Sequence, residues 1–505
     1  MSTHHNSPNK YLDEFMKKFR FEGLTFDDLS LLTQYADFLP DETSVETRLT
    51  TRVSLNVPFV SAAMDTVTEA PMAIAMAKAG GIGVIHKNLS PAQQADHVSR
   101  VKSHLNGLIH APVWFRTGIT LREIAAIRAE KKYSFSGFPI LDGNNRVVGV
   151  LTSKDIAYAE SPDVKVEDAM IDNIITAPAG TTLEEAYKIM RSNRKGKLPL
   201  VDSDGKLAGL YSFSDVHNLV NKNQPLFNRD ADHRLRAAAA VSGGNDYERV
   251  ERLAEAKVDV LVVDSAHGHT KGVMDMVKWI ARHYPDIDII AGNVATAEGA
   301  LALRDCGAHA VKVGIGPGSI CTTRVVCGVG VPQISAVYAA SKALEGTVPV
   351  ISDGGIRHSG DVPKALVAGA ESVMLGSVLA ATEESPGEKI ILEGRNYVIY
   401  RGMGSLAAMT AGKGSRERYA QSVDASTDDL VPQGIEGAIP FAGALRRVLH
   451  QFCGGLRSSL GYCGARDINE LRRIGRFVRV SSAGVREAHP HDIKITREAP
   501  NYRSY

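Results

Sequence analysis

A glycine-rich segment that leads into a cysteine is the strongest chemical signal in the sequence. Gly314, Gly316 and Gly318 alternate with other residues, and Cys321 follows them within the run GIGPGSICTTR. Alternating glycines allow a tightly folded backbone that directs carbonyl or amide groups inward. A cysteine acts as a nucleophile where its surroundings are polar and partly exposed and positive charge is near, and Arg324 closes the same run. The segment therefore predicts a nucleophilic Cys321, with a small core side chain as the alternative.

The remaining cysteines give no sign of a second chemical site. Cys306 precedes a glycine at the end of a predicted helix, and both Cys306 and Cys327 fit buried, inert thiols. The chain has 5 cysteines in 505 residues and no CxxC pair. An odd number of cysteines in so long a chain argues against a disulfide framework, and the spacing argues against a zinc site.

Short apolar segments alternate with amphipathic segments along the chain outside one region. Strands that are buried on both faces read as continuous apolar runs and need crossover helices between them. Eight such units predict an α/β fold of the (β/α)8 TIM-barrel type, with a doubly wound open sheet as the alternative. The predicted strands are Pro58–Ala62, Gly81–Ile85, Arg236–Val241, Val258–Asp264, Ile287–Ala291, Ala310–Val313, Val348–Ser352 and Ser372–Leu375.

The barrel prediction gives a use to two further glycine-rich segments. Barrels carry their functional groups at the carboxyl ends of the strands and commonly bind phosphate after strands seven and eight. Those two places hold SDGG at Ser352–Gly355 and LGS at Leu375–Ser377. Missing side chains let backbone N–H groups approach an anion closely. Glycines that only shape turns are the alternative, but two such loops at the two expected places favour a phosphate site.

An internal repeat interrupts the barrel between its second and third units. Phe138–Ile156 aligns without a gap on Leu198–Val216, at an offset of 60 residues. Each copy predicts a helix, a strand, a turn, a strand and a helix. We therefore expect a discontinuous catalytic barrel of residues 1–102 and 225–505, with an inserted subdomain of residues 103–224. Residues 402–437, here called the flap, are rich in Gly, Ser and charge with little periodicity, which predicts a mobile lid.

The composition excludes several classes of protein. The chain has 44% hydrophobic residues, and 58 basic against 57 acidic residues give a net charge of +1. This balance gives no general attraction to nucleic acid or to an anionic membrane. No apolar run approaches the length of a membrane span, and the polar amino terminus lacks the apolar core of a secretory signal. We expect an intracellular, cytoplasmic protein that needs neither a membrane nor a nucleic acid.

The sequence resembles the IMP dehydrogenase family over nearly its whole length. The family oxidises inosine monophosphate (IMP) to xanthosine monophosphate with NAD and water, on the route to guanine nucleotides. The resemblance thus implies NAD and IMP as small-molecule substrates and a TIM barrel with an inserted tandem CBS (Bateman) subdomain. It rests on LTFDD (Leu24–Asp28), PFVSAAMDTVTE (Pro58–Glu69), the repeat, GIGPGSICTTR (Gly314–Arg324), SDGGIR (Ser352–Arg357), YRGMGS (Tyr400–Ser405) and the pair Arg418-Tyr419.

The resemblance also implies a mechanism. Cys321 attacks C2 of the hypoxanthine ring, hydride passes from that carbon to NAD, and a covalent thioimidate remains. The flap then folds into the space that NADH leaves. Arg418 activates water there, with Thr323 and Tyr419 close by. Arginine is an unusual base because the free guanidinium stays protonated, so this role comes from the resemblance alone.

The binding residues follow from the same resemblance. The substrate residues are Ser61, Met64, Ser319, Asp353, Gly355, Gly376, Ser377, Tyr400, Gly402, Met403, Gly404 and Gln433. The NAD residues are Asp264, Ser265, Asn293, Gly314 and Gly316. The resemblance implies potassium on carbonyls of Gly316, Gly318 and Cys321. Glu487, Ala488 and His489 of the partner subunit would complete the shell of ligands. A shared site of this kind implies a homotetramer or an octamer. Gln433 stands where many members carry Glu, which puts a carboxylate proton relay there in doubt.

The repeat has two interpretations. In CBS domains that resemble it, hydroxyl groups contact phosphate and carboxylates contact ribose, which implies a regulatory purine nucleotide on Thr152, Asp155, Ser212 and Asp215. Residues of these types at a junction between strand and helix also cap helices routinely.

Two other functions compete with the dehydrogenase. GMP reductase resembles this barrel and shares the cysteine loop, but it typically lacks the CBS pair and the Arg418-Tyr419 pair. An inactive nucleotide sensor would have no reason to keep Cys321, Asp353 and Arg418. The CBS pair and the Arg418-Tyr419 pair favour the dehydrogenase over the reductase, and the intact site residues favour it over the sensor.

Overall fold

The computed structural model describes residues 9–19, 22–104, 108–109, 112–130, 137–220, 226–422 and 426–502. It divides into two compact units, one of residues 1–102, 226–230 and 235–505 and the other of residues 103–225 and 231–234. Within the described residues, no helix is both long enough and apolar enough to cross a membrane.

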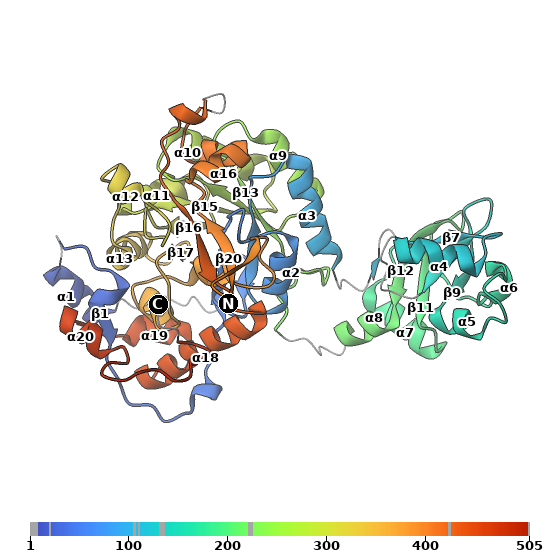
Figure 1. The fold of residues 1–505 in the computed structure, drawn as a ribbon, viewed down its shortest axis with the longest axis horizontal. Helices are drawn as coiled ribbons and strands as arrows, with labels where there is room; N and C mark the ends of the chain where they lie inside the picture. Colours follow the sequence, from blue (N-terminus) through green and yellow to red (C-terminus); the bar gives the residue numbers. More distant parts are fainter. Residues whose placement is uncertain are drawn as a thin grey trace. The chain divides into compact units, whose positions relative to one another are not determined.

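The first unit contains a closed barrel of eight parallel strands, which confirms the predicted fold class. The strands close in the order in which they occur along the chain. They are β4 (Phe59–Ser61), β5 (Ile82–Ile85), β13 (Ala238–Val241), β14 (Val260–Asp264), β15 (Asp288–Val294), β16 (Ala310–Val313), β17 (Val350–Asp353) and β18 (Ser372–Leu375). Of these, β13, β15, β16 and β17 are labelled in Figure 1.

Alternate residues of these strands enter two separate cores. Val260 and Val262 pack with the interior cluster of the barrel, whereas Leu261 and Val263 pack outward with the helices. Both faces are therefore apolar, as the side-chain period of a strand requires. The crossover helices are α2 (Ala70–Lys78), α3 (Pro91–Ser103), α9 (Tyr247–Glu255), α10 (Lys271–His283), α11 (Ala297–Asp305), α13 (Gln333–Leu344) and α14 (Asp361–Val367).

Further elements surround the barrel within the first unit. β1 (Leu29–Leu31) pairs antiparallel with β22 (Phe477–Arg479), which joins two segments far apart in the sequence. The short β2 (Thr47–Arg48) and β3 (Ser54–Leu55) pair with each other. The helices are α1 (Lys10–Lys18), α12 (Thr323–Val326), α15 (Ser377–Ala380), α18 (Leu445–Cys463), α19 (Ile468–Ile474) and α20 (Ser482–Glu487), with 3-10 turns at Phe26–Asp28 and Pro40–Glu42.

The flap contains more regular structure than its sequence indicates. It begins after β20 (Arg395–Arg401), which pairs with β19 (Lys389–Leu392) and β21 (Glu436–Pro440). Between β20 and β21 lie α16 (Leu406–Ala411), α17 (Lys413–Arg418) and a 3-10 turn at Thr427–Asp429. Each helix has six residues, and so short a helix leaves no periodic pattern. Ser405 caps the amino-terminal end of α16, since its hydroxyl accepts the N–H of Ala408 at 3.2 Å.

The second unit holds both copies of the repeat. Each copy has the predicted strand, turn, strand and helix, preceded by a helix and by a short parallel strand that the sequence did not predict. Each copy also has its own apolar core. The strands of the second unit are β6 (Leu108–Ile109), β7 (Phe115–Arg116), β8 (Phe138–Leu141), β9 (Val147–Leu151), β10 (Ala177–Pro178), β11 (Lys197–Val201) and β12 (Leu207–Ser212). Its helices are α4 (Leu121–Glu130), α5 (Ser153–Tyr158), α6 (Val166–Ala169), α7 (Leu183–Ser192) and α8 (Phe213–Val220).

Candidate active site

The carboxyl ends of the barrel strands and the flap enclose a cavity of about 470 Å³. Segments far apart in the sequence meet there, and most of the candidate residues line it. Those residues are Met64, Asn293, Gly314, Gly316, Gly318, Ser319, Cys321, Thr323, Asp353, Gly355, Gly376, Ser377, Tyr400, Gly402, Met403, Arg418, Tyr419 and Gln433.

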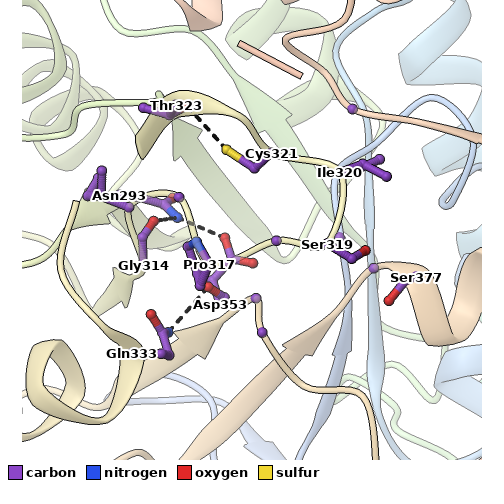
Figure 2. A pocket seen from close by; sticks show the side chains of 18 of the residues that line it. Asn293, Gly314, Pro317, Ser319, Ile320, Cys321, Thr323, Gln333, Asp353 and Ser377 are labelled. Carbon is purple, nitrogen blue, oxygen red and sulfur yellow. Dashed lines mark hydrogen bonds between the residues drawn. The ribbon is translucent and has the colours of Figure 1, made fainter. Parts of the chain in front are cut away.

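The cysteine loop after β16 presents Cys321 to this cavity. The Cys321 thiol is partly exposed and donates to the Thr323 hydroxyl, with Sγ and Oγ1 3.1 Å apart (Figure 2). Arg324 turns back into the loop, where its Nε donates to the Ile315 carbonyl at 3.0 Å. Burial lowers the pKa of the Arg324 guanidinium and the Cys321 thiol opposes that effect. Arg324 therefore holds the loop in shape beside Cys321.

The other cysteines differ from Cys321 in their surroundings. Burial raises the pKa of the thiols of Cys453 and Cys463 to about 11, and Cys306 is buried as predicted. Cys327 is exposed, so the prediction of a buried thiol was wrong there. It follows the short α12, whose four residues end at the surface.

A buried lysine organises the floor of the cavity. Lys312 in β16 is only 1% exposed at its side chain, and its Nζ lies 3.0 Å from Asp264 Oδ1 and 2.6 Å from Asp353 Oδ2. It also donates to the Asn293 side chain. Asn293 Nδ2 in turn donates to the Gly314 carbonyl at 2.7 Å and to Asp353 Oδ2 at 2.9 Å (Figure 2). A buried cation thus fixes two carboxylates, of which Asp353 lines the cavity and Asp264 does not.

Arg418 from the flap docks onto the opposite side of Asp264. The Arg418 guanidinium pairs with Asp264 Oδ2, and its carbonyl accepts the N–H of Ala266 at 2.9 Å. Lys87, which is 2% exposed, donates from Nζ to the Asp264 carbonyl at 2.8 Å. Burial lowers the pKa of Lys87 to about 7, and the nearby Arg418 cation acts in the same direction. Burial also raises the pKa of the Tyr419 hydroxyl.

The region expected to hold phosphate is compact. Tyr400 is buried, which raises the pKa of its hydroxyl, and Ser319 lies within hydrogen-bonding reach of it. A Cβ at Gly376 would lie 2.9 Å from the Tyr400 hydroxyl oxygen, so only glycine allows that approach. Ser319 and Ser377 lie on the same side of the cavity (Figure 2). Backbone amides and hydroxyl groups at this place are suited to an anion.

Several candidate residues lie outside the cavity wall. Ser61 is fully buried and its hydroxyl bonds that of Thr68 at 2.8 Å. Gly404 packs behind the Tyr419 ring, and Asp264 and Ser265 lie beneath Arg418. Glu487, Ala488 and His489 end α20 and are exposed.

The four candidate nucleotide residues of the repeat lie in the second unit. Asp155 Oδ2 accepts both the N–H and the hydroxyl of Thr152 at 2.7 Å, which is a helix cap. The Ser212 hydroxyl accepts from Lys197 Nζ at 3.0 Å and lies 3.1 Å from Ser214 Oγ. The Ser214 hydroxyl donates to Asp215 at 3.4 Å. In the first copy, the two candidate side chains thus bond each other.

The sequence analysis missed part of the cavity wall. Gln333 Nε2 donates to the Val313 carbonyl at 2.8 Å, and its buried Oε1 has no partner among the described residues. Asp27 and Arg357 form an ion pair at the rim. Lys312 does not line the cavity, but it contacts Asn293 and Asp353, which do. A lysine inside an apolar strand was the available signal for it. The remaining wall residues are Thr25, Phe26, Ala62, Ala266, Ile315, Pro317, Ile320, Arg324, Gly354, Ile356 and Met374.

Comparison with known proteins identifies the relatives of this chain. A family model described as the IMP dehydrogenase / GMP reductase domain matches residues 23–491. The inosine-5'-monophosphate dehydrogenase of Halalkalibacterium halodurans is 50% identical over 96% of this chain and 99% of its own. That of Aquifex aeolicus is 51% identical over 97% and 99%. A solved structure of a GMP reductase variant from Trypanosoma brucei with guanosine 5'-monophosphate matches with a TM-score of 0.84 at 38% identity, covering 94% of this chain and 98% of that one.

Proposed function

The chain belongs to the IMP dehydrogenase / GMP reductase family, and from this premise we propose how its residues carry out an NAD-dependent oxidation of IMP. The protein is an IMP dehydrogenase that produces xanthosine monophosphate for GMP synthesis. The observation that carries this function is an identity of 50% to a curated IMP dehydrogenase over 99% of that relative's length. The cavity supplies the chemistry, because Cys321, Thr323 and Arg418 line it together.

The inserted unit does not separate the dehydrogenase from GMP reductase. The matching Trypanosoma brucei GMP reductase covers 94% of this chain, which includes most of the insertion. The insertion alone therefore does not favour the dehydrogenase, and the higher identity to dehydrogenases decides instead. The test is to mix the protein with IMP, NAD and potassium and to follow NADH absorbance. A protein that forms no NADH but oxidises NADPH with GMP would instead be a reductase.

The first chemical step uses Cys321. The Cys321 thiol loses its proton to solvent, its sulfur forms a bond to C2 of the base, hydride leaves C2 for NAD, and the nucleotide stays attached as a thioimidate. Thr323, which accepts from the thiol at 3.1 Å, holds Sγ in the cavity. Ser319, Gly355, Gly376, Ser377 and Tyr400 bind the phosphate, Asp353 the ribose, and Met403, Gly404 and Gln433 the base.

The second step uses the flap. NAD lies on Asp264, Ser265, Asn293, Gly314 and Gly316. Arg418 pairs with Asp264 in this structure, and the Ser265 hydroxyl lies 3.5 Å from the Arg418 carbonyl. The docked flap and NAD therefore compete for the same groups. NADH leaves, the flap docks, and Arg418 with Tyr419 activates the water that attacks C2 and releases Cys321.

Potassium is proposed on the cysteine loop. The donors are carbonyls of Gly316, Gly318 and Cys321, and backbone oxygens suit a weakly hydrated monovalent cation. The Gly318 carbonyl accepts the Cys321 N–H at 3.1 Å, which leaves its second lone pair for an ion. These carbonyls fill part of a shell. Glu487, Ala488 and His489 of the partner subunit complete it, in a homotetramer or octamer with cyclic contacts.

We expect activity to depend on potassium and on the residues after Arg486. NADH formation should rise saturably with potassium, fall when sodium or lithium replaces it, and drop on truncation before Glu487. Activity assays and light scattering across potassium concentrations measure both effects. A fully active monomer, or indifference to the cation, would contradict the shared site.

We place the enzyme in the cytoplasm, because its five cysteines are free thiols, which suits a reducing compartment.

The insertion is proposed to bind a purine nucleotide and to regulate the barrel. Each copy of the repeat has its own core, and the chain leaves after α3 and returns before β13, between complete βα units. Deleting residues 103–224 and joining the ends with a short Gly/Ser linker should therefore leave a soluble, active barrel. Steady-state kinetics and thermal melting measure this. Loss of soluble, active protein with several linker lengths would show that the insertion stabilises the barrel.

A further inference from the structure

Two glycines of the flap lie unusually close to the barrel where β5 ends. A Cβ at Gly414 in α17 would lie 2.5 Å from the carbonyl oxygen of Lys87. A Cβ at Gly412, just before α17, would lie 2.1 Å from the side-chain oxygen of Asn88. Real Cβ atoms do not approach other atoms so closely. The docked flap thus fits this surface only with glycine at both positions.

The surface that faces these glycines is rigid. The Lys87 side chain is buried and its Nζ donates to the Asp264 carbonyl, so the backbone of Lys87 is fixed between two strands. Asn88 Nδ2 donates to Asp65 Oδ2 at 2.8 Å and to the Ala408 carbonyl in α16 at 3.2 Å. Asp65 also pairs with Arg401, the last residue of β20 before the flap. Neither Lys87 nor Asn88 can move away from a larger residue at low cost.

A third contact holds the other end of α17. Ser242 follows β13, is 4% exposed, and donates from its hydroxyl to Glu417 Oε2 at 2.5 Å. Glu417 precedes Arg418, so this bond fixes the turn of α17 that carries the guanidinium. The Glu417 carboxylate also lies near Lys87 and opposes the effect of burial on the pKa of that lysine.

We propose that Lys87, Asn88 and Ser242 form a docking seat for α17, and that this seat sets how long Arg418 stays over the covalent nucleotide. The inference rests on the proposed function, because it concerns the hydrolytic step of that reaction. The seat residues do not contact the reacting atoms and act by positioning Arg418. A weaker seat shifts the flap towards its undocked form, in which NAD can bind to the covalent enzyme instead.

The Gly414→Ala variant separates docking from folding. Alanine favours a helix over glycine, so the change does not disfavour α17 in an undocked flap. In the docked flap the added methyl meets the Lys87 carbonyl. Overpacking of this kind shifts an equilibrium by about tenfold or more. Gly437→Ala in β21 is the matched control, since a Cβ there has no atom within 4 Å.

The test measures each step in the full-length enzyme. In single-turnover mixing with IMP and NAD, Gly414→Ala should give a normal NADH burst. Its steady-state rate should fall about tenfold or more, and its inhibition by excess NAD should begin at lower NAD concentration. Intact mass spectrometry should show nucleotide on Cys321. Trypsin should cleave after Lys413, Arg416 or Arg418 faster than in the wild type. Gly437→Ala should match the wild type in all of these.

A second variant guards against a general packing defect. Ser242→Ala adds no atoms, and it should change the same measurements in the same direction by a few-fold. A Gly414→Ala enzyme that matches Gly437→Ala would overturn the seat, and so would loss of the burst together with turnover, or a Ser242→Ala enzyme that matches the wild type. Failure of the wild type to form NADH would instead overturn the proposed function.

Discussion

Replacing Cys321 with alanine should abolish NADH formation and leave nucleotide binding largely intact. In the proposed mechanism the sulfur forms the bond to C2, whereas the phosphate and ribose contacts come from Ser319, Gly376, Tyr400 and Asp353. We expect turnover below about a hundredth of the wild type. NADH absorbance measures the loss. Titration calorimetry with IMP measures the binding that remains.

The other cysteines provide matched controls for Cys321→Ala. Cys453→Ala and Cys463→Ala remove thiols whose pKa burial raises to about 11, far above the pH of the assay. Their thiolate forms are scarce, so each change should cost only stability, by about 1–3 kcal/mol. Turnover by Cys321→Ala above about a hundredth of the wild type would contradict the assignment of Cys321 as the nucleophile. A comparable loss of turnover in either control would contradict it as well.

The barrel could be predicted because its strands follow one simple physical rule. Residues such as Val260 and Val262 enter the interior while Leu261 and Val263 face the helices. Every position must then be apolar, and each strand reads as an apolar run. The same rule hides the direction of a side chain. Ser61 stays a predicted substrate residue, while β4 is buried at all three residues and the Ser61 hydroxyl bonds that of Thr68 in this structure.

The contacts around Asp264 could not be predicted from the sequence. Lys312 stands out as a lysine in an apolar strand, yet its partners Asp264 and Asp353 come from β14 and β17. Arg418 reaches Asp264 from a six-residue helix in the flap. Pairings over such separations depend on closure of the barrel, and the local pattern does not carry them. The seat contacts of Gly412 and Gly414 depend on it in the same way.

Replacing Arg418 with alanine should divide the reaction between its two steps. Hydride transfer needs Cys321 and NAD, so the first turnover should still give a fast NADH burst. In the proposed second step, hydrolysis needs the docked guanidinium, so the steady-state rate should fall by about 100-fold or more. Stopped-flow absorbance measures the burst. Intact mass spectrometry measures the stalled adduct, which is IMP less one hydride and one proton. Arg416→Ala is the control, because Arg416 on the same helix donates to the Met409 carbonyl away from the cavity.

The species that accumulates decides the role of Arg418. Without the guanidinium, Asp264 keeps its contacts with Lys312 and Lys87, and the groups proposed for NAD stay open. NAD should then bind the covalent enzyme and inhibit at lower concentration than in the wild type. A general loss of structure would remove the burst and the adduct together. If the burst disappears with turnover in Arg418→Ala but not in Arg416→Ala, Arg418 serves hydride transfer and another group must activate the water.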